Sequence, residues 1–287
     1  MMAAPQIVNA MTVDVEDYFH VSAFDGIVSR AGWDGYESRV SRNTERLLEV
    51  FAAANVRSTF FVLGWVADKF PALVRRIADA GHEVASHGYH HQLLYVLTPQ
   101  QFREDVRRAK LTLEQASGRP VLGFRAPSFS VIKSSLWALD VLIEEGHVYD
   151  ASIFPIHHDR YGIPDAPRHA HVMRRSAGSL VEMPASTVQL GRFNFPIAGG
   201  GYFRLLPYGW TRWGMRRINE IERQPVVFYM HPWEVDPDQP RMEVGRMTRW
   251  RHYGGLEKTV DRLRRLLHDF RFDSLESILK LPAREAA

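Results

Sequence analysis

The spacing of apolar residues changes repeatedly along the chain, and the changes predict alternating strands and helices. Continuous runs of aliphatic and aromatic residues predict buried strands at residues 7–15, 58–64, 82–88, 121–127, 180–186 and 225–232. Stripes with a helical period predict helices at residues 38–54, 70–81, 98–118, 134–146, 208–222 and 254–270. This order, with short connections, is typical of parallel strands joined by crossover helices.

Two longer stretches, about 153–178 and 187–205, lack a clear period and are expected to be irregular. The second contains the Gly199–Gly201 run without the Lys and Ser/Thr of a phosphate-binding loop, so we expect a flexible or tightly turned loop. No composition shift or internal repeat marks a boundary. We therefore expect one domain over residues 1–287, with its motifs in 8–235 and a C-terminal helical extension over 236–287.

Composition narrows the function classes. A chain of 287 residues with 45% hydrophobic residues can form one large α/β barrel. Without cysteine, any metal must be held by histidine and carboxylate. A net charge of +3 without a basic run argues against a nucleic-acid partner. No signal peptide and no apolar run of about 18 residues is found, so we expect a cytoplasmic protein, with peripheral association with the inner membrane left open.

Acidic, basic and imidazole side chains recur where the predicted strands end. In parallel sheets the active site lies at the carboxyl ends of the strands, so these side chains are expected to converge. They are Asp14, Glu16 and Asp17 on the first strand, His87, His90 and His91 on the third, Arg125 on the fourth, Glu182 on a later one, and His231 and Glu234 on the last.

The spacing of these residues predicts a metal site. Residues i and i+2 of a strand share a face, so Asp14 and Glu16 can point into the same mouth, and Asp17 would face away. One carboxylate with His87 and His91 is a ligand set that leaves room for water, and the second carboxylate could act as a base. Loop histidines and a solvated acidic loop are the structural alternative.

Two further residues have predicted catalytic roles. An arginine at position 125 would keep Asp14 ionised and hold its orientation, although a surface arginine would leave the same pattern. His231 follows a buried strand and is well placed as a general acid, although a hydrogen-bonded core histidine is the alternative. The Gly-x-Ser-x-Gly elbow of serine hydrolases is absent.

Five segments in order resemble the motifs of polysaccharide deacetylases with the NodB homology fold, carbohydrate esterase family 4. They are TVDVED, SHGYHH, FRAPSFS, YDASIFP and VVFYMHPWE. VDVEDYFH, GGGYFRLLP and YMHPWEVDPDQPR resemble more closely the exosortase-associated branch, which accompanies bacterial exopolysaccharide synthesis. The resemblance implies a distorted seven-stranded (β/α)7 TIM-like barrel and a divalent metal, as a rule zinc.

The resemblance also implies residue roles. His87 and His91 match the metal histidines, Arg125 the arginine that orients the base, and His231 the general acid, while Asp150 matches a supporting aspartate. The first motif departs from the family pattern of two adjacent aspartates. The best match is Asp14 as base and Glu16 as metal ligand, and Asp17 competes with Glu16 for the ligand role.

The function implied is that of a metal-dependent hydrolase. It would remove N-acetyl groups from an N-acetylhexosamine-containing polysaccharide or its precursor in exopolysaccharide biosynthesis. Its partner would be the N-acetylated glycan, and association with membrane exopolysaccharide machinery is compatible with this. An allantoinase-like amidohydrolase acting on a small cyclic amide and a catalytically silent glycan-binding module are the alternatives. The presence of both a base and an acid argues against the module.

Overall fold

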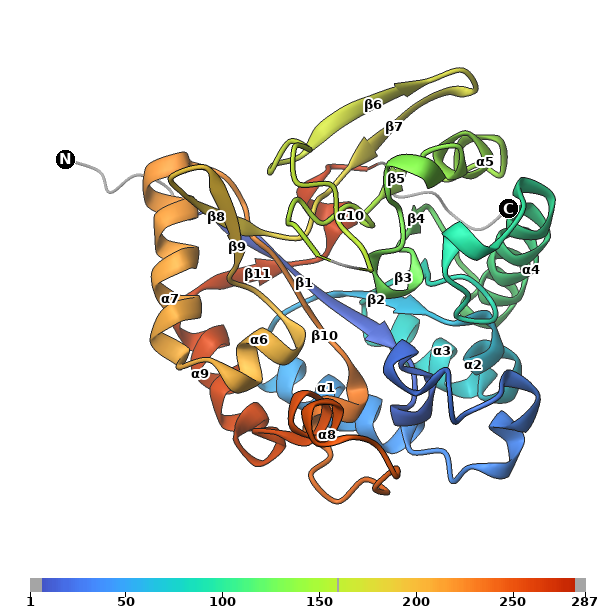
Figure 1. Ribbon diagram of the computed structural model, residues 1–287, viewed down its shortest axis with the longest axis horizontal. Coiled ribbons are helices and arrows are strands. Elements are labelled where there is room, and N and C mark those ends of the chain that lie inside the picture. The colour runs from blue at the N-terminus through green and yellow to red at the C-terminus, as the bar shows by residue number, and fades with distance from the viewer. Residues whose placement is uncertain (1–6, 159, 282–287) are drawn as a thin grey trace.

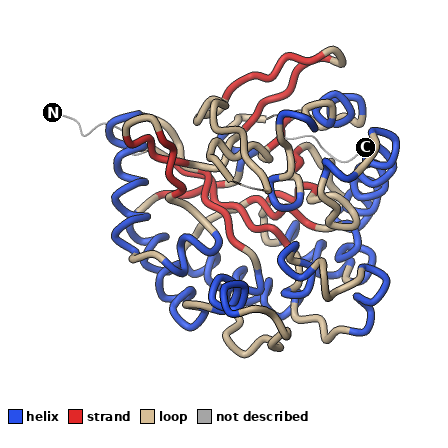
Figure 2. The backbone as a smooth tube through the Cα atoms, in the orientation of Figure 1, coloured by secondary structure: helices blue, strands red, loops and turns tan. Residues whose placement is uncertain are grey.

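The computed structural model describes residues 7–158 and 160–281, in which strands occupy the centre and helices the outside (Figures 1 and 2). The strands are β1 Val8–Val15, β2 Thr59–Val62, β3 Glu83–Ser86, β4 Gly123–Phe124, β5 Tyr149–Asp150, β6 His171–Arg175, β7 Gly178–Glu182, β8 Thr187–Leu190, β9 Phe193–Pro196, β10 Val227–Met230 and β11 Arg271–Asp273. The α-helices are α1 Val40–Ala53, α2 Gly64–Lys69, α3 Pro71–Asp79, α4 Pro99–Ser117, α5 Ala138–Glu144, α6 Gly200–Leu205, α7 Tyr208–Arg216, α8 Arg246–Tyr253, α9 Thr259–Asp269 and α10 Leu275–Ile278.

The main sheet has the order β10-β1-β2-β3-β4-β5-β7-β6. All its pairs are parallel except β6 with β7, and β11 adds a parallel pair to the start of β1. The strands β8 and β9 form a separate antiparallel hairpin. Parallel pairing brings the carboxyl ends of β1, β3, β4 and β10 to one edge, so the predicted α/β fold with a mostly parallel sheet is confirmed.

The sheet curls around a small interior core. Its buried members come from strands all around the sheet and pack into one cluster, which includes Ala10, Phe61, Ala85, Tyr149, Met183 and Val227. The two ends of the parallel run also approach each other, because the backbone N–H of Val227 donates to the Ser186 hydroxyl over 2.8 Å. This inward packing of side chains is the arrangement of a filled barrel.

A larger core lies between the strands and the outer helices. The apolar stripes of α1, α3, α7 and α9 all face it, with residues such as Phe51, Ile77, Met215 and Leu263 completely buried. Complete burial of a side chain of this size contributes about 1.5–3 kcal/mol, so the stripes hold these helices against the sheet. The predicted helices in these regions are confirmed.

The two stretches expected to be irregular contain further structure. The first includes β6, and the second contains the β8–β9 hairpin and α6. The strand β6 is an edge strand with partly exposed side chains, and β9 belongs to a two-stranded hairpin, so neither has the continuous apolar run of a buried strand. The C-terminal region is likewise not only helical, because it supplies β11.

None of the helices in the part of the chain described here combines the length and the hydrophobicity that a membrane span requires.

Candidate active site

The six residues predicted as the main catalytic residues and metal ligands lie together at the carboxyl edge of the barrel. Five of them line a cavity of about 370 Å³, and these are Asp14, Glu16, His87, His91 and His231. Arg125 is completely buried and contacts Asp14 from behind. The strand ends therefore bring acids, imidazoles and an arginine into one place, as the sequence predicted.

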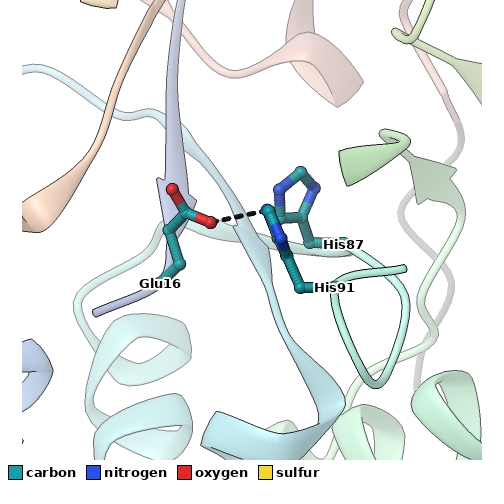
Figure 3. Close-up of side chains that lie close together, drawn as sticks. All are labelled: Glu16, His87 and His91. Atoms are coloured by element: carbon teal, nitrogen blue, oxygen red, sulfur yellow. Dashed lines mark ion pairs between the residues drawn. The ribbon is translucent and has the colours of Figure 1, made fainter. Parts of the chain in front are cut away.

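Glu16, His87 and His91 form the group that could hold a metal ion. One ligand atom from each lies within 4.8 Å of the others, and all three side chains are buried. The carboxylate points toward the two rings, with Glu16 Oε2 at 2.7 Å from His91 Nε2 (Figure 3). Burial alone would raise the pKa of Glu16, but His91 and its neighbours lower it well below its usual range.

The donor set fits a divalent cation. His87 Nδ1 lies 2.8 Å from the Arg125 carbonyl oxygen, a contact in which the ring nitrogen must donate, so its Nε2 is left with a lone pair. Burial lowers the pKa of His87 to about 4, which favours this neutral form. Glu16 Oε2 is buried, and apart from its ion-pair contact with His91 it has no hydrogen-bond partner among the described residues. Two histidine ring nitrogens and one carboxylate oxygen are ligands typical of catalytic zinc.

Asp17, the alternative ligand, has a structural role. Its Oδ2 accepts hydrogen bonds from the Ser38 hydroxyl at 2.6 Å and from the backbone N–H groups of Arg39 and Val40 at 2.8 and 3.1 Å. Its Oδ1 accepts from the Tyr18 N–H. Asp17 thus caps the start of α1 from a distant loop, and its oxygens are already used.

The loop that carries the two histidines is fixed by Asp105 of α4. Its carboxylate accepts from the backbone N–H groups of Tyr89 and His90, at 2.7 and 3.2 Å, and lies 3.0 Å from His90 Nδ1. Gly88 and His91 both have positive φ, +72° and +51°. The left-handed residues turn the loop tightly enough to return His91 to the side of His87.

Asp14 is held by Arg125 through one oxygen only. Arg125 Nη1 donates to Asp14 Oδ1 at 2.7 Å and to the Thr12 hydroxyl at 2.8 Å, while its Nε donates to the Ala151 carbonyl. The guanidinium also lies 4.2 Å from the centre of the Phe61 ring. Arg125 thus orients the carboxylate of Asp14. Because Asp14 lines the cavity, its carboxylate remains accessible from there.

His231 is oriented by Glu234, a strand-end carboxylate to which the sequence assigned no role. Its Nδ1 lies 2.6 Å from Glu234 Oε1, and Glu234 Oε2 accepts from Arg204 Nε at 2.7 Å. The other ring nitrogen, Nε2, faces the acids, at 3.9 Å from Asp14 Oδ2 and 3.6 Å from Glu16 Oε1. Burial alone would lower the pKa of His231, but the bond to Glu234 and the nearby negative charges raise it to about 9.

The signal for Glu234 was present three residues after His231, the spacing of a capping box. The signal for Arg204 was weaker. Arg204 belongs to α6, which begins in the glycine run that was expected to be a loop. Gly199 at the start of this helix has φ +98° and lies so close to Tyr229 that a Cβ atom would not fit there. The close approach of these glycines to β10 brings Arg204 to the catalytic edge.

Asp150, to which the resemblance gives a supporting role, lies beside Glu182. It accepts a hydrogen bond from Ser152, whose hydroxyl accepts from the Ala126 N–H at 2.7 Å. Burial raises the pKa of Asp150 to about 6 and that of Glu182 well above its usual range. His158 and Arg160, which belong to the first stretch expected to be irregular, also line the cavity.

Comparison with known proteins shows what two parts of the chain resemble. Residues 32–142 match the polysaccharide deacetylase family, and residues 151–280 match a domain of unknown function, DUF3473. Residues 32–142 therefore resemble polysaccharide deacetylases, and residues 151–280 resemble a domain whose function is not defined. Each of the two matches covers less than half of the chain.

The curated relatives match over limited regions. The peptidoglycan-N-acetylglucosamine deacetylase of Bacillus cereus is 32% identical over 98 residues, which is 34% of this chain and 36% of that protein. The peptidoglycan deacetylase of Helicobacter pylori is 31% identical over 116 residues, 40% of this chain and 37% of that protein. The matched region thus spans only about a third of the length of these relatives.

Solved structures match over most of the chain. A family 4 carbohydrate esterase from Streptomyces lividans is 16% identical with a TM-score of 0.52, covering 93% of this chain and 88% of that one. A CE4 family pseudoenzyme from Bacillus anthracis is 13% identical with a TM-score of 0.51, covering 96% and 66%. Such likeness establishes the fold, and because the fold also occurs in a pseudoenzyme, activity must be argued from the residues.

Proposed function

We propose that this protein is a metal-dependent hydrolase that removes N-acetyl groups from N-acetylhexosamine units of a glycan. The observation that carries the proposal is the convergence of three kinds of group on one cavity: a metal-type ligand set, a carboxylate held by arginine, and a histidine held by Glu234. The substrate class is supported by the similarity to a peptidoglycan-N-acetylglucosamine deacetylase and a peptidoglycan deacetylase.

Glu16, His87 and His91 would hold the metal, and the donor set favours zinc. A divalent metal supplies a Lewis acid that polarises a carbonyl and lowers the pKa of water. The role of the glycan as an exopolysaccharide or its precursor, near membrane machinery, belongs to the same proposal and rests on the branch-like motifs VDVEDYFH and GGGYFRLLP.

The protein residues would share the proton transfers. Asp14 would take the proton of the attacking water, because one of its oxygens is fixed by Arg125 and the carboxylate borders the cavity. The backbone N–H of Ser128, which lines the cavity with φ +51°, would donate to the oxygen that becomes negative. His231 would donate its Nε2 proton to the leaving amine while Glu234 holds Nδ1.

The test is acetate release from a panel of N-acetylated oligosaccharides, with chelator and with zinc restored, and with allantoin as an additional substrate. We expect zinc-dependent acetate release that is lost in Asp14→Asn while zinc content is unchanged. Hydrolysis of allantoin alone would favour the amidohydrolase. Zinc-loaded protein that binds glycans but releases no acetate would instead identify a silent binding module.

A further inference from the structure

The charges that line the cavity are uneven. Its only acids among the described residues are Asp14 and Glu16, and both already have cationic or imidazole partners. A divalent cation held by Glu16 and the histidines would add further positive charge. The deep part of the cavity therefore has no excess of negative charge with which to balance cations at its mouth.

Three arginines also line the cavity, and two of them have no acidic partner among the residues that the structure describes. Arg204 is buried and paired with Glu234. Arg160 and Arg251 are exposed, and neither forms an ion pair with any residue in 7–158 or 160–281. Asp25 is close enough for Arg160 to affect its pKa, but the two side chains are not in ion-pair contact.

The two arginines come from separate parts of the chain. Arg160 follows β5, in the first irregular stretch, and Arg251 lies on α8. That helix has three arginines and no acidic residue over Arg246–Tyr253. Low-dielectric walls concentrate such a field inside a cleft, which attracts anions to it. The guanidinium fork also matches the geometry of carboxylate and phosphate oxygens.

We propose that the natural substrate is an anionic glycan, in which an N-acetylhexosamine has a neighbouring sugar that carries a carboxylate or a phosphate. Arg160 and Arg251 bind this anionic group and so determine specificity. This inference rests on the proposed function and narrows its substrate class. The chemistry common to both substituents is a pair of anionic oxygens presented to a guanidinium.

The test compares three N-acetylated oligosaccharides of equal length: a neutral one, one with a uronate neighbour and one with a phosphate-substituted neighbour. For the zinc-loaded full chain we expect kcat/KM to be about tenfold higher for at least one charged substrate than for the neutral one. The charged substrate that is preferred shows whether the natural substituent is a carboxylate or a phosphate. Raising the salt concentration should reduce this preference, because exposed charges are screened beyond about 10 Å at 0.1 M.

Variants locate the effect. Arg160→Gln and Arg251→Gln should each lower the ratio of charged to neutral kcat/KM about threefold to tenfold, mainly through KM. Arg249→Gln is the matched control, since Arg249 is exposed on the same helix and does not line the cavity. The ratio should be unchanged in this control.

Two results would overturn the inference: equal kcat/KM for charged and neutral substrates, or a charge preference that survives in the Arg160→Gln/Arg251→Gln double variant. The inference and the proposed function can fail separately. If no substrate releases acetate, the proposed function fails, and equilibrium binding of the same oligosaccharides to Asp14→Asn still tests the preference for anions. Equal binding of all three would then refute it.

Discussion

Replacement of Glu234 by glutamine should reveal two separate roles of this carboxylate. It balances the charge of Arg204, and it holds the ring of His231 with Nε2 toward the cavity. The side chains of Glu234 and Arg204 are each 1% exposed, so neither charge can be compensated by water. The charge-balancing role should affect stability, and the ring-holding role should affect catalysis.

The size of the stability effect follows from burial. Removing one partner of a buried ion pair leaves the other charge uncompensated and costs about 3–5 kcal/mol. Unfolding entropy is about 2 cal/mol/K per residue, so for 287 residues the melting temperature of Glu234→Gln should fall by about 5–8 °C. In the Arg204→Met/Glu234→Gln double variant both charges are gone, and at least half of the lost stability should return.

Activity should not return with stability. Both variants lack the carboxylate at His231 Nδ1, so kcat should be lower by about 10²-fold, the lower end of the contribution of a general acid. Thermal unfolding, bound zinc and acetate release should be measured on the same preparations, with the exposed Glu257→Gln as control. A double variant that recovers wild-type kcat would refute the reasoning, because Glu234 would then serve only to neutralise Arg204.

Three further predictions concern other parts of the site and barrel. Asp17→Ala should destabilise the protein by about 1–3 kcal/mol, since it leaves buried donors unpaired. In metal analysis this variant should retain zinc, whereas Glu16→Ala should lose it. Gly199→Ala should lower the free energy of unfolding in urea by about 1–3 kcal/mol, because the added Cβ would lie 2.4 Å from a backbone oxygen of β10. Gly209→Ala is the control and should not destabilise the protein, because the space around Gly209 is open. Burial raises the pKa of Glu83 to about 7 from its ordinary 4.5, so the folded state binds this proton more tightly than the unfolded state does. The free energy of unfolding should therefore fall by about 3 kcal/mol as the pH rises from 4.5 to 7. Glu83→Gln should remove this pH dependence.

Much of the site could be predicted because its signals are local. The i, i+2 spacing of Asp14 and Glu16 follows from strand geometry alone, and the structure indeed turns both acids toward His231. The positions of His87 and Arg125 at strand ends needed only the rule that parallel strands end at a common edge. The roles assigned to these residues remain predictions until activity is measured.

The residues whose roles were missed depend on contacts between distant segments. Arg204 and Glu234 are 30 positions apart. No periodic pattern in the sequence indicates that α6, which begins with glycines, contacts the segment after β10. The capping role of Asp17 required knowledge that α1 begins beside it, 21 to 23 residues later. Arg160 and Arg251 similarly reach one cavity from separate loops and helices.

The sequence by itself determined the order of six strands of the main sheet, which are β1, β2, β3, β4, β7 and β10, and of the amphipathic helices that pack on it. It also determined the kinds of side chain at the ends of these strands, because periodicity is a property of short segments. Tertiary structure alone decided which acid faces the histidines, which acid caps a helix, and which carboxylate orients His231. The physical reason is that these choices depend on which buried charge finds a partner, and partners are supplied by packing between segments far apart in the chain.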